Sequence, residues 1–216
     1  MTTLVVVAKQ PVPGRVKTRL HPPYTLGQAA VLAHACLLDT LDTLDRVPAA
    51  RRILFVDGVL PHRAGWVQWR QPSGTLDERI AWCLDRLTGP MLLVGMDTPQ
   101  LDPATLARAF DWPDEVDAFF GPADDGGYWA IGLREPDGAL VRGVPMSRAD
   151  TGAQQLARLA AAGLRVAHLP ALRDIDTAAD LAPAAARAPR LAAALAGLAS
   201  ERLNLPRTAL LAGGSQ

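Results

Sequence analysis

The 216-residue chain has few of the features that mark several large classes of protein. It contains two cysteines, Cys36 and Cys83, and both lie in apolar surroundings. Buried thiols are therefore expected, rather than a disulfide framework or a metal site. No apolar run approaches the ~20 residues that span a bilayer. The short apolar run near the N-terminus lacks the charged flank of a signal peptide. We expect a cytoplasmic protein that does not bind membranes.

Excess charge and several catalytic signatures are also missing. Lysine plus arginine (22) equals aspartate plus glutamate (22), so the net charge is zero. A general nucleic-acid binder would usually show a basic excess, and no nucleic-acid partner is expected. The four histidines have no metal-ligand spacing with one another or with the cysteines. There is no G-x-S-x-G stretch of a serine hydrolase and no G-x-G-x-x-G dinucleotide fingerprint.

Apolar runs that alternate with helical patterns organise most of the chain. Continuous runs at 4–7, 53–56 and 91–94 are typical of strands buried on both faces of a parallel sheet. Further strands are predicted at 66–69, 118–120, 128–133 and 164–169, and helices at 25–44, 76–87, 103–110 and 152–162. This alternation predicts a three-layer α/β/α domain with a mostly parallel mixed sheet.

The C-terminal part of the chain is rich in alanine. It is predicted to be helical from Thr177 onward, with Pro183 and Pro189 interrupting the helix. We expect a single domain over residues 1–200 and a loose tail over 201–216. Exposed apolar faces of the alanine-rich part are the surface on which a homodimer could form.

A basic loop follows the first predicted strand directly. It contains Lys9, Gly14, Lys17 and Arg19. In open α/β sheets, ligands bind at the carboxyl ends of the strands. Glycine lets the backbone approach a phosphate, lysine supplies a point charge, and arginine grips phosphate oxygens as a fork. The spelling G-x-x-K-T-R-L differs from the Walker pattern. The loop predicts a phosphate site, and a solvated basic surface loop is the alternative.

Carboxylates occur at two further positions where a strand is predicted to end. Asp97 follows the strand at 91–94, and Asp174 and Asp176 lie in an extended segment at i and i+2, a spacing that points both side chains the same way. Mg²⁺ prefers one or two carboxylates together with phosphate oxygens and water. The alternatives are helix-capping roles. Asp102 is a better cap than Asp97 for the helix at 103–110, whereas Asp176 or Thr177 could cap the next helix.

A glycine pair lies between two predicted apolar strands. Asp125, Gly126 and Gly127 belong to the loop 121–127. Paired glycines allow a ligand to approach the backbone, but they also form ordinary hairpin turns. The residue types alone favour an ordinary hairpin turn. The position between two apolar strands fits both a hairpin turn and a ligand-binding loop.

Four motifs occur along the chain in a fixed order: K-x-P-x-P-G-x-x-K-T-R-L from Lys9, G-x-D-x-P-x-L from Gly95, G-P-A-x-D-G-G-Y from Gly121, and D-I-D-T-x-x-D-L from Asp174. Together they resemble the DUF2064 family of the GT-A superfamily, also called selenodomain-associated transferase 1. That family is similar to 2-phospho-L-lactate guanylyltransferase and to the molybdenum-cofactor nucleotidyltransferases. The resemblance covers about residues 3–181 and implies the GT-A, Rossmann-like fold of nucleotide-diphospho-sugar transferases.

The resemblance also implies a role for each motif. The implied sets are Lys17, Arg19 and Asp97 for catalysis; Lys9, Gly14, Lys17, Arg19, Gln71, Gly74 and Arg79 for the nucleotide; Asp125, Gly126, Gly127 and Ser147 for the acceptor pocket; and Asp97, Asp174 and Asp176 for Mg²⁺ or Mn²⁺. The chain departs from the family pattern at Thr75, Asp77 and Met146, the last where a tryptophan is usual. The departures leave the acceptor open.

The leading hypothesis is a Mg²⁺-dependent nucleotidyltransferase. It would join the nucleoside monophosphate of a triphosphate, with GTP or CTP favoured by the resemblance, to a small phosphorylated or phosphonate acceptor and release pyrophosphate. One alternative is a GT-A glycosyltransferase that uses a nucleotide sugar, since Asp174-Ile175-Asp176 has the D-x-D spelling. The other alternative is a module that binds nucleotides without catalysing a reaction.

Overall fold

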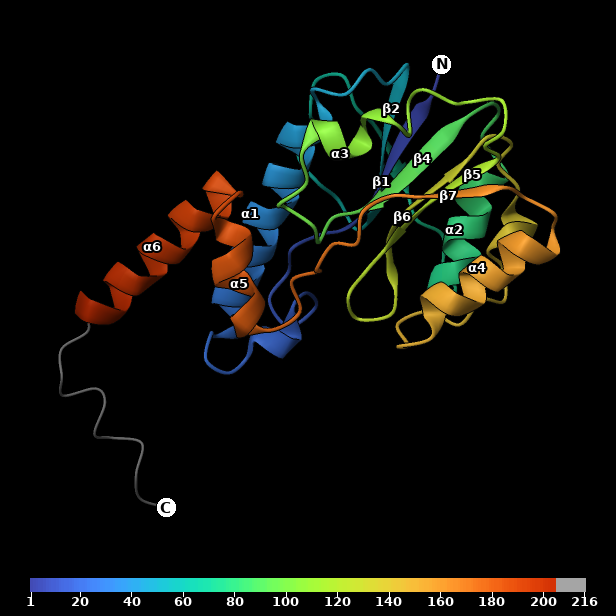
Figure 1. Cartoon of the computed structure of the whole chain (residues 1–216). Helices are drawn as coiled ribbons and strands as arrows, with labels where there is room; N and C mark the ends of the chain where they lie inside the picture. The colour runs from blue at the N-terminus through green and yellow to red at the C-terminus, as the bar shows by residue number, and fades with distance from the viewer. Residues whose placement is uncertain (205–216) are drawn as a thin grey trace.

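The protein is described over residues 1–204 by a computed structural model, which shows a twisted sheet between helical layers (Figure 1). The strands are β1 (Thr3–Lys9), β2 (Arg51–Asp57), β3 (Val67–Arg70), β4 (Met91–Gly95), β5 (Ala118–Pro122), β6 (Tyr128–Leu133) and β7 (Val166–His168). Their order in the sheet is β3-β2-β1-β4-β6-β5-β7. β6 is antiparallel to both of its neighbours, whereas the other pairs are parallel. The predicted mostly parallel mixed sheet is confirmed.

The helices are α1 (Leu26–Leu44), α2 (Leu76–Leu84), α3 (Pro103–Ala107), α4 (Thr151–Ala161), α5 (Ala178–Ala185) and α6 (Pro189–Asn204), with 3₁₀ turns η1 (Thr18–Leu20) and η2 (Gly138–Leu140). Helices α1, α2, α3 and α5 begin at residues whose side chains cap them. Thr25 and Gln28 form a capping box at α1, with reciprocal hydrogen bonds of 3.2 and 3.0 Å. Asp102 caps α3 by accepting a hydrogen bond from the Thr105 N–H, as the sequence predicts.

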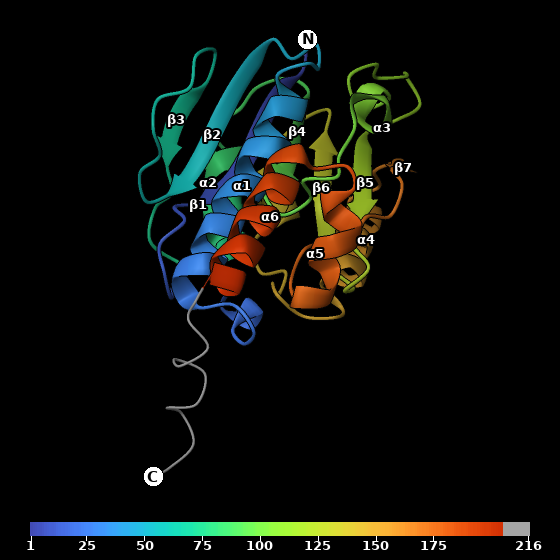
Figure 2. The ribbon, with the colours of Figure 1, turned by 90° about the vertical axis from the view of Figure 1, so that its left-hand side faces the viewer.

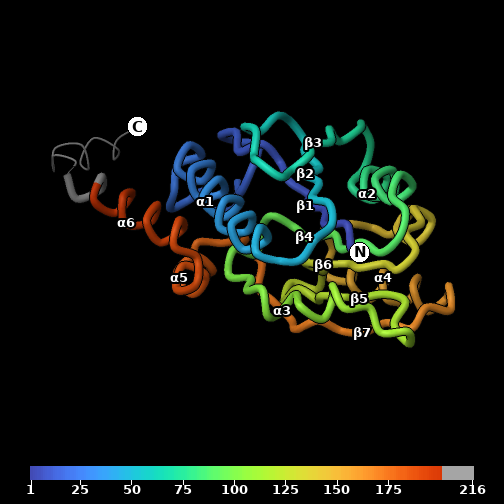
Figure 3. Tube along the Cα trace, turned by 90° about the horizontal axis from the view of Figure 1, so that it is seen from above, coloured from blue at the N-terminus to red at the C-terminus, as the bar shows by residue number. Residues whose placement is uncertain are grey.

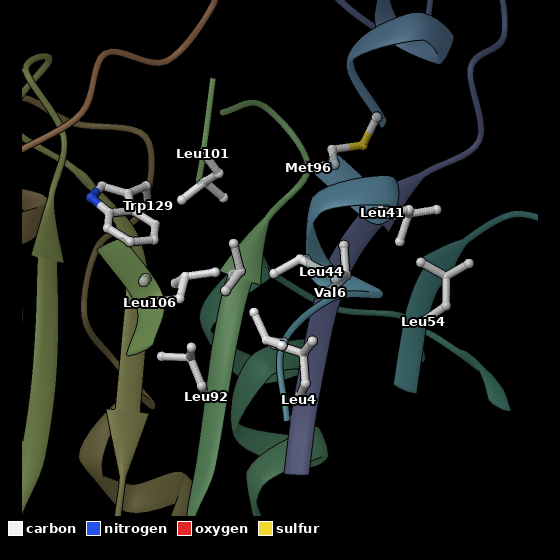
Figure 4. Close-up of a cluster of buried hydrophobic side chains, with 14 of the residues drawn as sticks. Leu4, Val6, Leu41, Leu44, Leu54, Leu92, Met96, Leu101, Leu106 and Trp129 are labelled. Atoms are coloured by element: carbon white, nitrogen blue, oxygen red, sulfur yellow. The ribbon is translucent and has the colours of Figure 1, made fainter. Parts of the chain in front are cut away.

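Alternate residues of the central strands face opposite sides of the sheet. Val6 of β1 lies beside Leu54 and Val94 and faces α1 and α3, and Figure 4 shows this cluster. Val5 belongs to the opposite cluster, which α2 and α4 cover. Each fully buried side chain of this size stabilises the fold by about 1.5–3 kcal/mol. The view from above shows the two helical layers on either side of the strands (Figure 3).

The alanine-rich end packs on α1. Its buried residues Leu181, Leu191 and Leu198 form a third cluster with residues of α1, and α6 runs alongside α1 (Figure 2). Asp39 of α1, almost fully buried, accepts the Arg190 and Leu191 N–H groups at the first turn of α6. These leucines are buried within the chain, so they are not part of any exposed apolar face on which a homodimer could form.

Of the two prolines predicted to interrupt this end of the chain, Pro189 lies at a break between helices and Pro183 does not. Pro183 lies inside α5, because burial of Leu181 and Ala184 holds the helix together around it. Pro189 begins α6, a position where the missing N–H costs little. The predicted tail starts within α6, which runs to Asn204, and residues 205–216 lie outside the described part of the chain. Over residues 1–204, no helix is long and apolar enough to cross a membrane.

Both cysteines are buried and free, as the sequence indicates. Burial raises the pKa of Cys36 and of Cys83 to about 12.

Candidate active site

Two adjoining cavities lie at the carboxyl ends of β1 and β4. The smaller, about 240 Å³, is lined by the basic loop, including Lys9, Lys17 and Arg19; we call it the loop cavity. The larger, about 570 Å³, extends across the sheet edge toward α2 and α4, and we call it the sheet cavity. Asp97 and Asp176 line both cavities. The first and last of the four sequence motifs therefore meet at one cleft, although they are more than 150 residues apart.

The basic loop turns its cations in different directions. Gly14 has φ +76, and Lys17 also adopts the left-handed region, with φ 48. Val16 and Leu20 on either side of Lys17 are buried, so the loop is anchored to the core there. The Lys17 side chain is only 8% exposed, whereas that of Arg19 is 71% exposed. A left-handed backbone at a residue other than glycine costs of order 1 kcal/mol, so packing must hold Lys17 in place.

Lys17 contacts carboxylates at the cleft. Its Nζ lies 2.9 Å from Asp97 Oδ1 and 3.9 Å from Asp176 Oδ1, and it donates a hydrogen bond to the Ile175 carbonyl oxygen. Burial alone would lower the pKa of this amine, but Asp97 and Asp176 more than offset it and the pKa is raised. The ammonium is therefore charged. In this structure Lys17 balances carboxylates, although the resemblance implies a phosphate-binding role.

Asp97, Asp174 and Asp176 form what we call the carboxylate cluster. The Ile175 N–H donates to the Asp97 carbonyl oxygen (3.2 Å) while the Ile175 side chain is buried, so the flanking carboxylates both line the sheet cavity. Thr177, not Asp176, is the N-cap of α5, which leaves the Asp176 carboxylate to the cleft. Asp102 is the N-cap of α3 and Thr177 is the N-cap of α5, so neither Asp97 nor Asp176 has the capping role that was its alternative.

Asp174 differs from the other two carboxylates. Its Oδ1 is buried and has no hydrogen-bond partner within the described chain. Burial and the charge of Asp97 raise the pKa of Asp174 to about 7, with Lys17 acting in the opposite direction. Across residues 1–204, no group of three or more His, Cys, Asp or Glu side chains is close enough to form a ready-made metal site. The predicted three-carboxylate site is therefore not preassembled. A hard cation would need phosphate oxygens or water beside one or two carboxylates.

A second charged group, the strand-end network, lies at the end of β2. It consists of Asp57, Gln71 and Arg79. The buried Gln71 amide donates to the carbonyl oxygens of Ala8 (3.1 Å) and Phe55 (2.9 Å) and accepts from Arg79 (2.9 Å). Asp57 lies 3.6 Å from Arg79.

Gln71 and Arg79, which the resemblance implies for nucleotide binding, thus join the ends of β1 and β2. Neither residue is among those that line the two cavities. Arg15 of the basic loop adds a second cation 3.9 Å from Asp57. Sequence reasoning missed Asp57, although its place at the end of a buried strand matches that of Asp97.

Two of the three departures from the family pattern, Thr75 and Asp77, have structural roles near α2. Thr75 and Glu78 form the capping box of α2. Gly74, with φ +122, leaves room for the Glu78 carboxylate, which a side chain at position 74 would strike. Asp77 accepts the Gly143 N–H at 2.7 Å. These residues therefore fix local structure beside the cleft.

The two glycines of the Gly126-Gly127 turn differ in their surroundings. The Gly152 N–H donates to the Gly126 carbonyl oxygen at 2.8 Å, and a Cβ at Gly126 would collide with the Ala149 carbonyl group. Gly126 therefore packs against the segment that leads into α4. Gly127 lines the sheet cavity together with Asp125 and Ser147, and these are residues to which the resemblance assigns an acceptor role.

The sheet cavity is lined by both apolar and charged side chains. Leu76, Ile80, Tyr128 and Met146, which belong to or pack against one apolar cluster, line it together with the exposed Arg148. The Tyr128 hydroxyl lies 3.8 Å from Met146 Sδ, and burial raises the pKa of this tyrosine, so its hydroxyl stays neutral. Such a surface suits a ligand with both apolar and anionic parts.

A family model described as "Uncharacterized protein conserved in bacteria (DUF2064)" matches residues 40–148, which is half of the chain. The chain belongs to the DUF2064 family. The matched range includes the motifs that begin at Gly95 and Gly121, whereas the basic loop and Asp174–Leu181 lie outside it. A search of curated proteins finds no match.

Solved structures share the fold of this DUF2064 chain. A protein from Desulfovibrio desulfuricans G20, provisionally described as a nucleotide-diphospho-sugar transferase, is 24% identical with a TM-score of 0.77, over 92% of this chain and 95% of that one. The manganese complex of Rv0371c from Mycobacterium tuberculosis H37Rv is 24% identical, with a TM-score of 0.52 over 85% and 96%. The 2-C-methyl-D-erythritol 4-phosphate cytidylyltransferase from Thermus thermophilus is 19% identical, with a TM-score of 0.50 over 88% and 100%. The fold is thus that of nucleotidyltransferases and GT-A-like transferases.

Proposed function

We propose that this protein is a divalent-metal-dependent nucleotidyltransferase. It would join the nucleoside monophosphate of a nucleoside triphosphate to a small phosphorylated or phosphonate acceptor. The observation that carries the proposal is the meeting of the basic loop with the carboxylate cluster at the carboxyl ends of β1 and β4.

The reaction requires charge and positioning rather than a protein nucleophile. An acceptor oxygen would attack the α-phosphorus in line, the bond from that phosphorus to the bridging oxygen would break, and pyrophosphate would leave. Lys9 and Arg19 line the loop cavity, and they would hold the leaving phosphates. Arg19 is well exposed, so its guanidinium can turn toward an incoming anion.

The carboxylate cluster has the chemistry of a Mg²⁺ or Mn²⁺ site. Within residues 1–204, the buried Oδ1 of Asp174 has no hydrogen-bond partner and would be a ligand for the ion, with Asp97 and Asp176 supplying further carboxylate oxygens. When bound, the ion would neutralise charge on the phosphate oxygens. The manganese complex of the related fold adds support for a divalent ion.

The sheet cavity is the proposed acceptor site. Its volume of about 570 Å³ falls in the usual range for small-molecule sites. Arg148 and Ser147 would meet an anionic group of the acceptor, and Tyr128 with Met146 would cover its apolar part. GTP and CTP are the donors to test first, CTP because the Thermus thermophilus structure of this fold is a cytidylyltransferase.

The test is a two-step screen on the wild-type protein. Melting temperature is first measured against GTP, CTP, ATP, UTP, UDP-glucose and GDP-mannose, each with and without Mg²⁺ or Mn²⁺. Ligand at ~100 times its Kd stabilises the folded state by about 2.7 kcal/mol. Acceptors are then screened for pyrophosphate release with the nucleotide that binds. A metal-dependent shift with a triphosphate, followed by pyrophosphate release, is the expected result.

Glycosyl transfer is the second candidate, because Asp174-Ile175-Asp176 has D-x-D spelling and both of its carboxylates line the sheet cavity. A shift with a nucleotide sugar alone, and release of a nucleoside diphosphate, would replace the first proposal with this one. The absence of a shift with every nucleotide would contradict both.

A further inference from the structure

Lys17 Nζ lies among oxygen atoms of the kind that bind hard metal ions. Its neighbours are carboxylate oxygens of Asp97 and Asp176 and the carbonyl oxygen of Ile175. Carboxylate and backbone carbonyl oxygens are the ligands that divalent hard cations prefer in proteins. The lysine ammonium is thus the cation that the protein itself supplies at this position.

The local fold directs Lys17 to this place. The left-handed backbone at Lys17 and the buried side chains of Val16 and Leu20 turn its amine inward, whereas Arg19 remains largely exposed. Lys17 lies between the Asp97 and Asp176 carboxylates, and Arg19 also contacts Asp176. Without nucleotide, Lys17 therefore holds together side chains that would otherwise repel one another.

We propose that Lys17 is the resident counter-cation of the metal position, and that its ammonium and a divalent ion exclude each other there. The inference rests on the proposed metal-dependent nucleotide chemistry. An ammonium and a divalent ion that share the same carboxylates repel each other. The phosphates of a nucleotide offer Lys17 other anionic partners in the adjoining loop cavity. Nucleotide thus favours the state in which Lys17 has left the carboxylates, and the metal binds together with the nucleotide.

Two consequences follow for metal binding without nucleotide. The wild-type protein binds free Mn²⁺ weakly, because the ion must displace a buried, charge-paired ammonium. Lys17→Met keeps most of the apolar side-chain length and removes the charge, so free Mn²⁺ meets no competitor. The variant should melt at a lower temperature than wild type in chelator, and Mn²⁺ should restore much of the difference.

The experiment is a Mn²⁺ titration followed by electron paramagnetic resonance, on wild type, Lys17→Met and Arg19→Met without nucleotide. Arg19→Met is the matched control, because Arg19 also contacts Asp176 (3.0 Å) but is exposed. We expect Lys17→Met to bind Mn²⁺ about tenfold or more tightly than wild type, which corresponds to ~1.4 kcal/mol. Arg19→Met should stay within about threefold of wild type, as the small energies of exposed ion pairs indicate.

Equal Mn²⁺ affinity in wild type and Lys17→Met would overturn the inference. Should Lys17→Met not fold, Lys17→Gln and the wild type alone still decide the question. Tight binding of free Mn²⁺ by the wild type, unchanged when GTP or CTP is added, would also overturn it. These measurements involve no turnover, so they are separate from the pyrophosphate assay that tests the proposed function.

Discussion

The carboxylate cluster and the strand-end network lie on either side of β1, at the ends of β4 and β2, yet their charges are balanced differently. In the strand-end network, Asp57 has two arginines within 4 Å, Arg15 and Arg79. In the carboxylate cluster, Lys17 and Arg19 contact Asp97 and Asp176, whereas Asp174 Oδ1 has no partner within the described chain. Both regions are charged groups at the ends of buried strands, where ligands bind in open α/β sheets.

The difference indicates which charged group supports structure and which awaits a ligand. A carboxylate that has enough cations and hydrogen bonds is satisfied by the fold itself. A buried carboxyl oxygen that has no hydrogen-bond partner within residues 1–204 is destabilising, and a bound cation would lower that cost. We therefore assign the strand-end network to positioning the ends of β1 and β2, and the carboxylate cluster to the proposed metal and nucleotide.

The largest predicted effect belongs to Asp97. Asp97→Asn removes the carboxylate closest to Lys17 and weakens the proposed metal site. We expect turnover to fall by about 10²–10³-fold, in line with the loss of one preorganised charge-stabilising group. Pyrophosphate release, measured on a verified donor and acceptor pair, checks the outcome.

Asp57→Asn is the matched control in the strand-end network. Because Asp57 and its arginines are partly exposed, its replacement should cost less than about 1 kcal/mol of unfolding free energy. It should leave the metal dependence of nucleotide binding unchanged. Equal losses of turnover in Asp57→Asn and Asp97→Asn would remove the distinction between the two regions.

The next effect concerns Gln71. Gln71→Met preserves approximate volume but removes the donors to the Ala8 and Phe55 carbonyl oxygens and the acceptor for Arg79. Leaving buried polar groups unsatisfied should cost about 2 kcal/mol of unfolding free energy. Urea denaturation measures it. A variant as stable as wild type, with loss of nucleotide binding only, would show that Gln71 contacts the ligand directly.

The sequence was informative where local pattern and topology agree. Continuous apolar runs predicted β1, β2 and β4, and they put both the basic loop and Asp97 at the ends of strands, where ligands bind in open α/β sheets. The inward turn of Lys17 was not predictable, because it depends on a left-handed backbone and on the buried Val16 and Leu20. Contacts between distant segments, such as Gln71 with Ala8, also leave no local signal.

The smallest predicted effect concerns a carboxylate far from the cleft, where α1 meets α6. It tests whether a carboxylate paired with two arginines serves the fold alone. Asp42 accepts hydrogen bonds from Arg63 and Arg190, both at 2.7 Å, so it resembles Asp57 in having two arginines. Burial would raise the pKa of Asp42, but these hydrogen bonds more than offset it, and the pKa lies below its usual value. A lowered pKa means that the unfolded chain binds the proton more readily than the folded one.

Asp42 should therefore stabilise the protein above the ordinary aspartate pKa, with the contribution lost as pH falls through the lower folded value. Asp42→Asn should bring the melting temperature of the variant close to that of wild type in acid and leave a gap near pH 7. Paired melting curves across this range measure the gap, which should be small because the arginines are partly exposed. A gap that widens toward acid would contradict the assignment of Asp42 as a carboxylate satisfied by the fold. The strand-end network would then be the single example of charged groups satisfied by the fold with which the carboxylate cluster is compared.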